Sequence, residues 1–462
     1  MSTTGPAAPL AGDAASRATA APVDAAARLR SAAYARLLVL AAIIGAPVSA
    51  AAYFFLQLVG MLQSWVYEDL PRAVGFATAP LWWPLPMLGI SGVLVGLTIQ
   101  HLPGRGGHSP VDGFNPGGVP KPVELPGVLL AALASLGLGV VLGPEAPLIA
   151  LGGGLAVCAV RLSRRDVPER VGAVVASAGS FAAISALLGS PITGAFLLME
   201  ASGLGGPTLG LVLLPGLLAA GIGSLIFVGL DQLTGLGPVA LAVPGLPPFA
   251  HPDIAQFGWA LVIGVLAALV GSGIRWLATA LRPHVERHTV LLTSVVGLAV
   301  AGLAIAYLAV TGHGFADVLF SGQAELGPLL QDGAGYSVGA LLMLLVCKGL
   351  AYGLSMSSFR GGPVFPALYI GAAGGIVLSH LPGLPMVAGV AMGIGAMCAV
   401  MLRLPLTAVM LATLLLFADG LAVMPLVIVA VVVAHVVSAW LAPRQPPSSP
   451  PGDAGPRRPL PR

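Results

Sequence analysis

Long apolar stretches, separated by short polar or Gly/Pro-rich segments, dominate this chain. Each of nine stretches is close to the ~20 residues that cross ~30 Å of hydrocarbon as a helix. They cover residues 37–62, 85–99, 171–199, 207–230, 257–274, 289–311, 336–358, 386–401 and 421–442. The pattern predicts a polytopic membrane protein built of α-helices.

Four shorter apolar pieces, each bounded by Gly or Pro, lie between the long ones. They cover residues 127–142, 147–160, 364–378 and 404–417. We expect them to be too short to cross alone, and such pieces are tolerated at membrane depth only where protein or a water-filled cavity surrounds them. The expected fold class is therefore an all-α polytopic membrane protein of short, tilted and broken helices.

The composition excludes an ordinary soluble domain. Of the 462 residues, 57% are hydrophobic and 8% are charged, with a mean hydropathy of +0.95, whereas a soluble domain carries about 25% charged residues. The three cysteines stand singly in apolar runs, without the spacing of a metal site or a disulfide. The net charge of +3 gives no indication of nucleic-acid binding. We expect the lipid bilayer as the partner, and no cofactor or metal.

One motif occurs twice and divides the chain into two halves. Gly143–Pro147 reads GPEAP and Gly362–Pro366 reads GPVFP, and a further glycine follows each copy five residues later. A second pair of landmarks comes after them in the same order, at Pro191–Gly194 and Pro405–Ala408. Matched Gly/Pro breaks in two apolar halves indicate a substrate site built from discontinuous helices. The halves are expected at about 34–230 and 254–443, with inverted topology.

Charge placement predicts the orientation of the chain. Cytoplasmic loops carry an excess of Lys and Arg, and here the basic residues gather at both ends and in two loops. They are Arg28, Arg30, Arg36, Arg161, Arg164, Arg165, Arg170, Arg275, Arg282, Arg287 and Arg444. We expect a multi-pass protein of the plasma membrane with both termini cytoplasmic. Residues 1–33 and 444–462 are expected to be disordered tails that flank a membrane domain at 34–443.

The duplicated motif is suited to binding an anion. A proline at the first helical position leaves the N–H groups of the following turn free, and the helix dipole places partial positive charge there. Helix N-termini therefore bind anions readily. If the halves are inverted, two such N-termini converge on one point. Neither motif contains Lys or Arg, and a site without a full positive charge binds an anion weakly enough to release it quickly.

Glu145 is the only acid in either copy of the motif. An ionisable side chain within the membrane is energetically costly, and its presence therefore indicates a function. Its carboxylate can occupy the anion position itself, and protonation would free that position, so we interpret Glu145 as a gate. The structural alternative is an acid that only stabilises the N-terminus of its own helix.

An intramembrane enzyme and a cation-coupled solute carrier are the two alternatives to anion transport. An intramembrane enzyme would need an HExxH motif, paired aspartates, or a GxSG serine with a base at a suitable spacing. The sequence contains neither of the first two, and the GISG at residues 89–92 stands without such a base. The protein is therefore not expected to be an enzyme. A cation-coupled solute carrier with inverted repeats also uses broken helices and remains a lower alternative, although N-termini at both breaks favour an anion.

These motifs resemble those of the CLC family of chloride channels and chloride/proton antiporters. The resemblance extends from about Arg36 to Arg444. It implies two inverted halves, a homodimer, and a separate pathway in each subunit for chloride or a similar monovalent anion. The GPEAP segment is similar to the family's G(K/R)EGP signature, with Pro144 in place of the basic residue, and Glu145 falls on the family's gating glutamate.

The other signatures of the family are matched unevenly. Residues 106–110 (GGHSP) resemble GSGIP, with Gly107 at the serine position and Ser109 as another hydroxyl. Residues 361–366 (GGPVFP) resemble GGxFxP, and the tyrosine of the last helix is missing after Val423. The anion-binding residues that the resemblance implies are Gly107, Ser109, Pro110, Gly143, Ala146, Gly362, Val364 and Phe365.

Proton coupling depends on a second acid. Family antiporters carry an internal glutamate, and alignment of Pro191–Gly194 with the family places Ala201 at that position, next to Glu200. One residue turns a helix by ~100°, so Glu200, the candidate second acid, is expected on a different face. The resemblance therefore implies chloride transport gated by Glu145. Channel-like or uncoupled flux is favoured, with chloride/proton antiport as the alternative.

Overall fold

The computed structural model describes residues 29–113, 120–163, 169–203, 207–236, 249, 251–416 and 420–442. Residues 1–28 of the predicted tail at 1–33, the whole predicted tail at 444–462, and the basic positions Arg28, Arg164, Arg165 and Arg444 lie outside these residues. Within the described ranges the regular elements are helices and no strand is present. The prediction of an all-α membrane protein is therefore confirmed.

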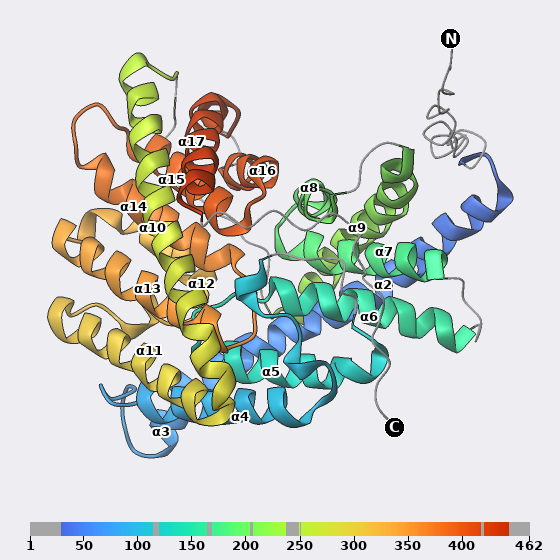
Figure 1. Cartoon of the computed structure of the whole chain (residues 1–462), viewed down its shortest axis with the longest axis horizontal. Coiled ribbons are helices and arrows are strands. Elements are labelled where there is room, and N and C mark those ends of the chain that lie inside the picture. The colour runs from blue at the N-terminus through green and yellow to red at the C-terminus, as the bar shows by residue number, and fades with distance from the viewer. Residues whose placement is uncertain are drawn as a thin grey trace, which may run out of the picture.

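The helices of the first half include a long α2 and the pair α5 and α6 that flanks the first GPxxP motif (Figure 1). Their bounds are α2 (Ala32–Ser64), α3 (Leu70–Ala73), α4 (Pro84–His101), α5 (Leu125–Gly137), α6 (Glu145–Ser163), α7 (Glu169–Leu187), α8 (Pro191–Ser202) and α9 (Pro207–Thr234). A π-helical turn joins α2 to α3, and short 3-10 turns lie before α5, at Pro103–Gly106, Pro110–Asp112 and Pro122–Glu124.

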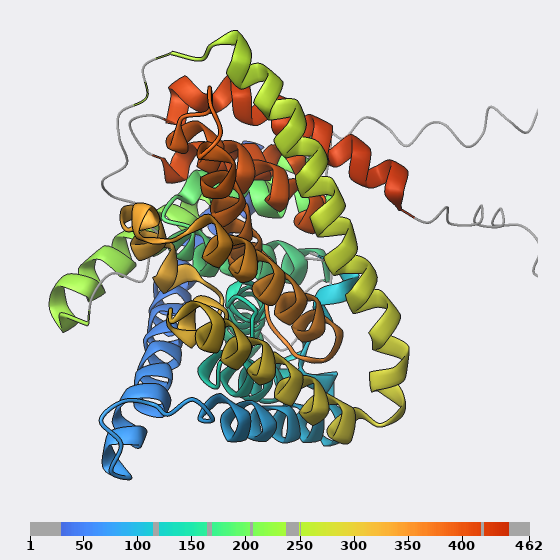
Figure 2. The same ribbon diagram turned by 90° about the vertical axis from the view of Figure 1, so that its left-hand side faces the viewer.

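The second half begins with the 34-residue helix α10, which runs along one edge of the molecule (Figure 2). The bounds are α10 (Ile254–Arg287), α11 (Thr289–Thr311), α12 (Gln323–Gln331), α13 (Val338–Ser358), α14 (Val364–Ser379), α15 (Met386–Leu402), α16 (Pro405–Leu415) and α17 (Gly420–Leu441). Short 3-10 turns at Phe315–Asp317 and Gly333–Gly335 flank α12.

Packing in the first half is repeated in the second. The contacts α2–α7, α6–α7 and α7–α9 have their counterparts in α10–α15, α14–α15 and α15–α17. Helices α4 and α11, which occupy equivalent places, pack against each other, as do α8 and α16. The sequence duplication is therefore a structural duplication, and the two halves meet through equivalent elements.

Eight segments of the described chain are long and apolar enough to cross a membrane. Three of the predictions for the apolar stretches are wrong. The stretch 386–401 forms α15, whose 17 residues place it among the shorter apolar helices. The stretch 171–199 is not one helix, because the chain breaks after α7 and Ser190 caps α8, its hydroxyl accepting a hydrogen bond from the Thr193 N–H at 3.4 Å. The piece at 147–160 belongs to α6, whose segment Glu145–Leu162 has spanning length, so it was wrongly judged too short.

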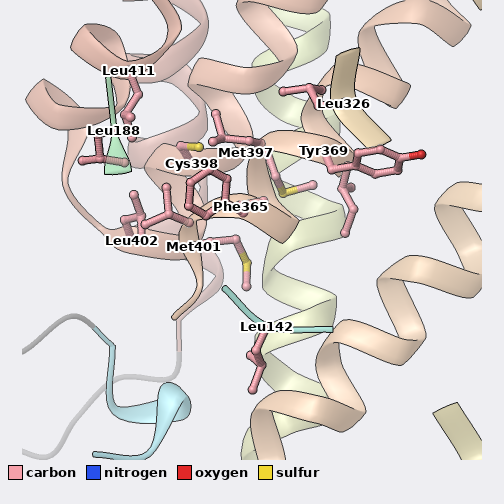
Figure 3. Packing of buried hydrophobic residues seen from close by; sticks show 14 of the residues in the cluster. Leu142, Leu188, Leu326, Phe365, Tyr369, Met397, Cys398, Met401, Leu402 and Leu411 are labelled. Atoms are coloured by element: carbon pink, nitrogen blue, oxygen red, sulfur yellow. The ribbon is translucent and has the colours of Figure 1, made fainter. Parts of the chain in front are cut away.

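Helices α14 and α15 form the centre of the core. Nearly every residue from Val364 to Ile376 and from Val387 to Leu402 is buried, as expected of helices that are hydrophobic on all sides. Phe365, Met397 and Cys398 pack together there (Figure 3). Gly371 faces the backbone of Gly393. Small residues at this crossing allow the two backbones to approach closely.

A buried lysine supports the loop that precedes α12. Lys348 in α13 is 0% exposed, and its Nζ donates hydrogen bonds to the carbonyl oxygens of Asp317, Val318 and Leu319 at 2.8, 3.3 and 3.1 Å. The same Nζ lies 4.3 Å from the centre of the Tyr369 ring on α14. Lys348 thus ties this loop to the two helices that lead into and out of the second GPxxP motif.

The α14–α15 crossing gives a direct test of the packing. A Cβ at Gly371 would collide with the Gly393 carbonyl oxygen, whereas a Cβ at Gly374 on the same helix would meet no atom within 4 Å. Overpacking costs about 1–3 kcal/mol, so Gly371→Ala should lower the apparent melting temperature in detergent. Gly374→Ala, the matched control, should leave it unchanged or raise it, since Ala is the better helix former by up to ~1 kcal/mol. Equal melting curves for both variants would contradict the close approach of the two helices at Gly371.

Candidate anion site

The two GPxxP loops meet at equivalent residues. The Gly143 N–H donates to the Gly362 carbonyl at 2.8 Å, and the Gly362 N–H donates to the Gly143 carbonyl at 2.6 Å. The pair forms an isolated antiparallel bridge, so the chain runs in opposite directions through the two motifs. This local antiparallel arrangement is the one expected of inverted halves.

Two serines at equivalent places support the loops from opposite sides. Ser135 in α5 accepts a hydrogen bond from the Arg360 N–H, and Ser355 in α13 accepts one from the Val141 N–H, both at 3.3 Å. Each helix that leads into one motif thereby holds the loop of the other. Sequence reasoning missed both serines because nothing local in the chain distinguishes them from other serines in apolar helices.

Helices α6 and α14 begin beside this bridge, at Glu145 and Val364. The first N–H groups of a helix have no intrahelical acceptor. Pro147 and Pro366 stand third in their helices and have no N–H. Each N-terminus therefore offers the N–H groups of its first two residues. Both helices start beside the bridged loops, so the two sets of donors belong to one site.

The Glu145 side chain lies between the two N-termini and is 0% exposed. Its Oε1 accepts a hydrogen bond from the Phe365 N–H at 2.8 Å, across the interface between the halves. Its Oε2 has no hydrogen-bond partner among the described residues. Glu145 thus bonds to the other helix, which is more than an acid stabilising its own N-terminus would do.

Gly143 and Gly362 provide the space for this carboxylate. A Cβ at Gly362 would collide with Oε2 of Glu145, and a Cβ at Gly143 would collide with both carboxylate oxygens. The first glycine of each motif is therefore explained by packing against Glu145 as well as by the bridge. Of the predicted anion-binding residues, Gly143, Gly362 and Phe365 contact or border the Glu145 carboxylate, and Val364 is the fully buried first residue of α14.

The remaining predicted residues line a cavity of about 260 Å³ on the other side of Ala146. We call this cavity the vestibule. Its wall includes the predicted residues Gly107, Ser109, Pro110 and Ala146. Other wall residues are Gly104, Gly106, His108, Gly113, Pro120, Glu124, Val128, Pro147, Ile149, Ala150, Arg360, Gly361 and Pro363. The structure therefore divides the predicted set into an inner group at Glu145 and an outer group at the vestibule.

A run of left-handed backbone, of which the three glycines line the vestibule, borders this cavity. Gly104, Arg105, Gly106 and Gly107 have φ values of 76°, 51°, 72° and 93°. Glycine adopts such conformations without the steric penalty that a Cβ brings. A side chain at Gly107 would therefore be strained, which accounts for the glycine at this position.

Tyr352 lies behind the second motif and was not predicted. It is fully buried in α13, and its hydroxyl donates to the Pro363 carbonyl at 2.8 Å. This bond fixes the residue immediately before α14. Because the hydroxyl is already used, Tyr352 supports the loop and does not replace the missing tyrosine of the last helix.

Glu200 caps a neighbouring helix. Its Oε1 accepts from the Leu406 N–H at 2.9 Å, and its Oε2 accepts from the Thr407 N–H and hydroxyl, both at 2.7 Å. A carboxylate at a helix N-terminus satisfies free N–H groups and complements the dipole. Both oxygens of Glu200 are thus occupied at the start of α16, in the second landmark of the duplication.

A family model described as "Voltage gated chloride channel" matches residues 115–439, more than half of the chain. The chain therefore belongs to the CLC family of anion transport proteins. This assignment excludes the enzyme and the cation-coupled solute carrier as classes for this protein.

Curated relatives and solved structures agree with the family. Two relatives carry the name "Putative ion-transport protein YfeO". The one from Salmonella paratyphi A is 30% identical over 349 residues, 75% of this chain and 81% of that protein. The one from Escherichia coli O6:H1 is 29% identical over 356 residues, 74% of this chain and 79% of that protein.

Two crystal structures share the fold. A slow cyanobacterial Cl⁻/H⁺ antiporter superposes with a TM-score of 0.69 at 20% identity, covering 88% of this chain and 95% of that one. A CLC-type fluoride/proton antiporter gives a TM-score of 0.62 at 21% identity, covering 87% and 95%. At these identities the likeness establishes the fold alone.

The capping role of Glu200 predicts a stability effect. Glu200→Gln removes the charge and leaves one acceptor oxygen for three donors, so we expect a loss of about 0.5–2 kcal/mol, as for other N-cap replacements. The measurement is the apparent melting temperature in detergent. Glu286→Gln is the matched control, because Glu286 makes an exposed ion pair with Arg282, and such pairs contribute little. A stable Glu200→Gln protein would show that the cap is dispensable.

Proposed function

We propose that the protein moves chloride through a pathway that runs from the vestibule past the N-termini of α6 and α14, with Glu145 as the gate. The observation that carries the proposal is the hydrogen bond from the Phe365 N–H to the Glu145 carboxylate at 2.8 Å. A carboxylate held by the donors of the opposite helix occupies the position that a small anion would take.

Protonation of Glu145 would open the pathway. The neutral carboxyl has no charge for the two helix dipoles to hold, so it gives up the donors more readily than the carboxylate does. Chloride then takes its place at the Val364 and Phe365 N–H groups, in the space that Gly143 and Gly362 leave. No Lys or Arg belongs to either motif, and binding by backbone donors alone is weak enough to allow release.

Uncoupled flux is favoured over exchange. A proton relay needs a second acid that can give up its hydrogen bonds, and the candidate Glu200 uses both oxygens to cap α16. Ala201, at the position of the family's internal glutamate, cannot carry a proton. Chloride/proton antiport is the alternative, since Glu145 is itself a group that binds and releases protons.

The family and the charge pattern support a proposal for the assembly and the orientation. We infer a homodimer with one pathway in each subunit, placed in the plasma membrane with both termini cytoplasmic. The proposed domain arrangement is a membrane body at about 34–443, with the halves at about 34–230 and 254–443. Helix α2 already begins at Ala32, inside the predicted N-terminal tail at 1–33.

Glu145→Gln tests the gate. The charged carboxylate blocks wild-type protein at high pH, so wild-type chloride flux should rise as pH falls. The amide is neutral at every pH, so the variant should show higher flux at neutral pH and a flat pH profile. The measurement is chloride efflux from liposomes containing purified protein at several values of pH. Glu200→Gln is the control and should keep the wild-type profile. A Glu145→Gln protein with wild-type flux and pH response would remove the gate assignment.

Proton coupling is tested by recording external pH during chloride efflux. We expect chloride to leave wild-type liposomes without proton movement against a gradient. Proton uptake driven by chloride efflux would establish exchange instead, with an inner relay that Ala201 cannot provide. Absence of chloride efflux in both wild type and Glu145→Gln would overturn chloride as the substrate, and fluoride would be tested next.

A further inference from the structure

Arg360 is the only Lys or Arg among the described residues that line the vestibule. It stands between the end of α13 and the start of α14, and it is partly buried. Its Nε donates to the Arg105 carbonyl at 3.3 Å, and its Nη1 donates to the Phe359 carbonyl at 3.2 Å. A guanidinium has five N–H donors. Three of them therefore have no acceptor among the residues that the structure describes.

The neighbouring acids are bonded to other groups. Asp112 pairs with Arg282, which also bonds Glu286 at 2.8 Å. Glu124, the acid on the vestibule wall, accepts the Lys121 N–H at 3.0 Å. In the described part of the chain no carboxylate lies in ion-pair contact with Arg360. Its charge is thus left without a paired carboxylate beside an open cavity.

Arg360 remains charged at neutral pH. Burial, with the nearby charges of Arg282 and Arg105, lowers its pKa to about 10. Protonation is therefore nearly complete at pH 7. Because Pro144 replaces the basic residue of the G(K/R)EGP signature, Arg360 supplies the positive charge that the first motif lacks, at a different point of the pathway.

We propose that Arg360 binds a second small monovalent anion in the vestibule, and that a planar oxyanion such as nitrate binds there more tightly than chloride. The inference rests on the proposed function, since it places this anion at the mouth of the same pathway. The planar guanidinium offers forked donors that match an oxyanion with two acceptor atoms. Ser109 lines the same cavity and can add a hydroxyl donor. A volume of about 260 Å³ accommodates such an ion with several waters, each of about 30 Å³.

Arg360 also holds the left-handed loop, and this role must be separated from anion binding. Arg105, whose carbonyl accepts the Nε bond, has a φ of 51°, which is uncommon outside glycine. Loss of this bond would affect the loop whether or not an anion binds. The charge of the guanidinium and its three unused N–H donors, by contrast, take no part in holding the loop and are available to an anion.

The test is isothermal titration of purified full-length protein with sodium nitrate and sodium chloride at pH 8.5. At this pH the Glu145 carboxylate is expected to occupy the inner position, so binding reports the vestibule. Wild type should bind nitrate more tightly than chloride. Arg360→Gln should weaken nitrate binding at least about tenfold, because a charge-assisted hydrogen bond contributes about 1.5–3 kcal/mol. Arg360→Lys should retain chloride binding and lose the preference for nitrate.

Arg105→Gln is the matched control. It removes a positive charge from the same loop, but the Arg105 side chain does not line the vestibule, so both affinities should stay at the wild-type values. Unchanged nitrate binding in Arg360→Gln would overturn the proposal, as would equal losses in Arg360→Gln and Arg105→Gln. If Arg360→Gln does not yield monodisperse protein, Arg360→Lys decides, and an unchanged nitrate preference in it counts against the proposal.

Localisation gives a second measurement. Crystals of wild type soaked in bromide should show an anomalous peak beside the Arg360 guanidinium, and a vestibule without a peak would contradict the assignment.

The titration and the crystal soak measure binding and do not depend on transport activity. A protein that binds nitrate at Arg360 but shows no flux in Glu145→Gln would refute the proposed function alone. Normal flux with no vestibule binding would refute this inference alone.

Discussion

The pair of hydrogen bonds between Gly143 and Gly362 is the contact on which the rest of the site depends. Both loops lie inside an apolar body, where an unpaired backbone N–H or carbonyl is costly. The bridge satisfies these groups by joining the loops to each other, and Ser135 and Ser355 satisfy two more. Once the loops are joined, the helices that follow them must start side by side. The convergence of two N-termini is thus a result of backbone hydrogen bonding.

The absence of side chains is as important as their presence around this contact. Gly143 and Gly362 leave room for the Glu145 carboxylate, and Gly371 and Gly393 allow α14 to lie against α15. An anion held here would meet backbone donors and little else. These four glycines therefore have two distinct physical roles, which composition alone does not separate.

The sequence predicted the fold class and the meeting of the two GPxxP motifs, because the repeated Gly/Pro motif encodes both the duplication and the helix starts. The sequence-based prediction failed where contacts between residues distant in the sequence determine the structure. Ser190 and Pro191 break the apolar run 171–199 by starting a new helix, and the hydropathy pattern cannot reveal such a helix cap. Glu145 itself begins α6, so α6 is longer than its apolar stretch. The partners of Ser135, Ser355 and Lys348 are distant in sequence and could not be assigned from local pattern.

The duplication also leaves one asymmetry. The sequence repeat aligns Gly143 with Gly362, and the same alignment matches Glu145 with Val364, an apolar residue that cannot be protonated. A scaffold with an approximate two-fold axis in the membrane plane has no preferred direction of its own. Under the proposed gating by Glu145, the single acid therefore gives the pathway its polarity. Opening would then be controlled only from the side of the membrane from which protons reach Glu145, and an otherwise similar protein with the acid at 364 would respond to the opposite side.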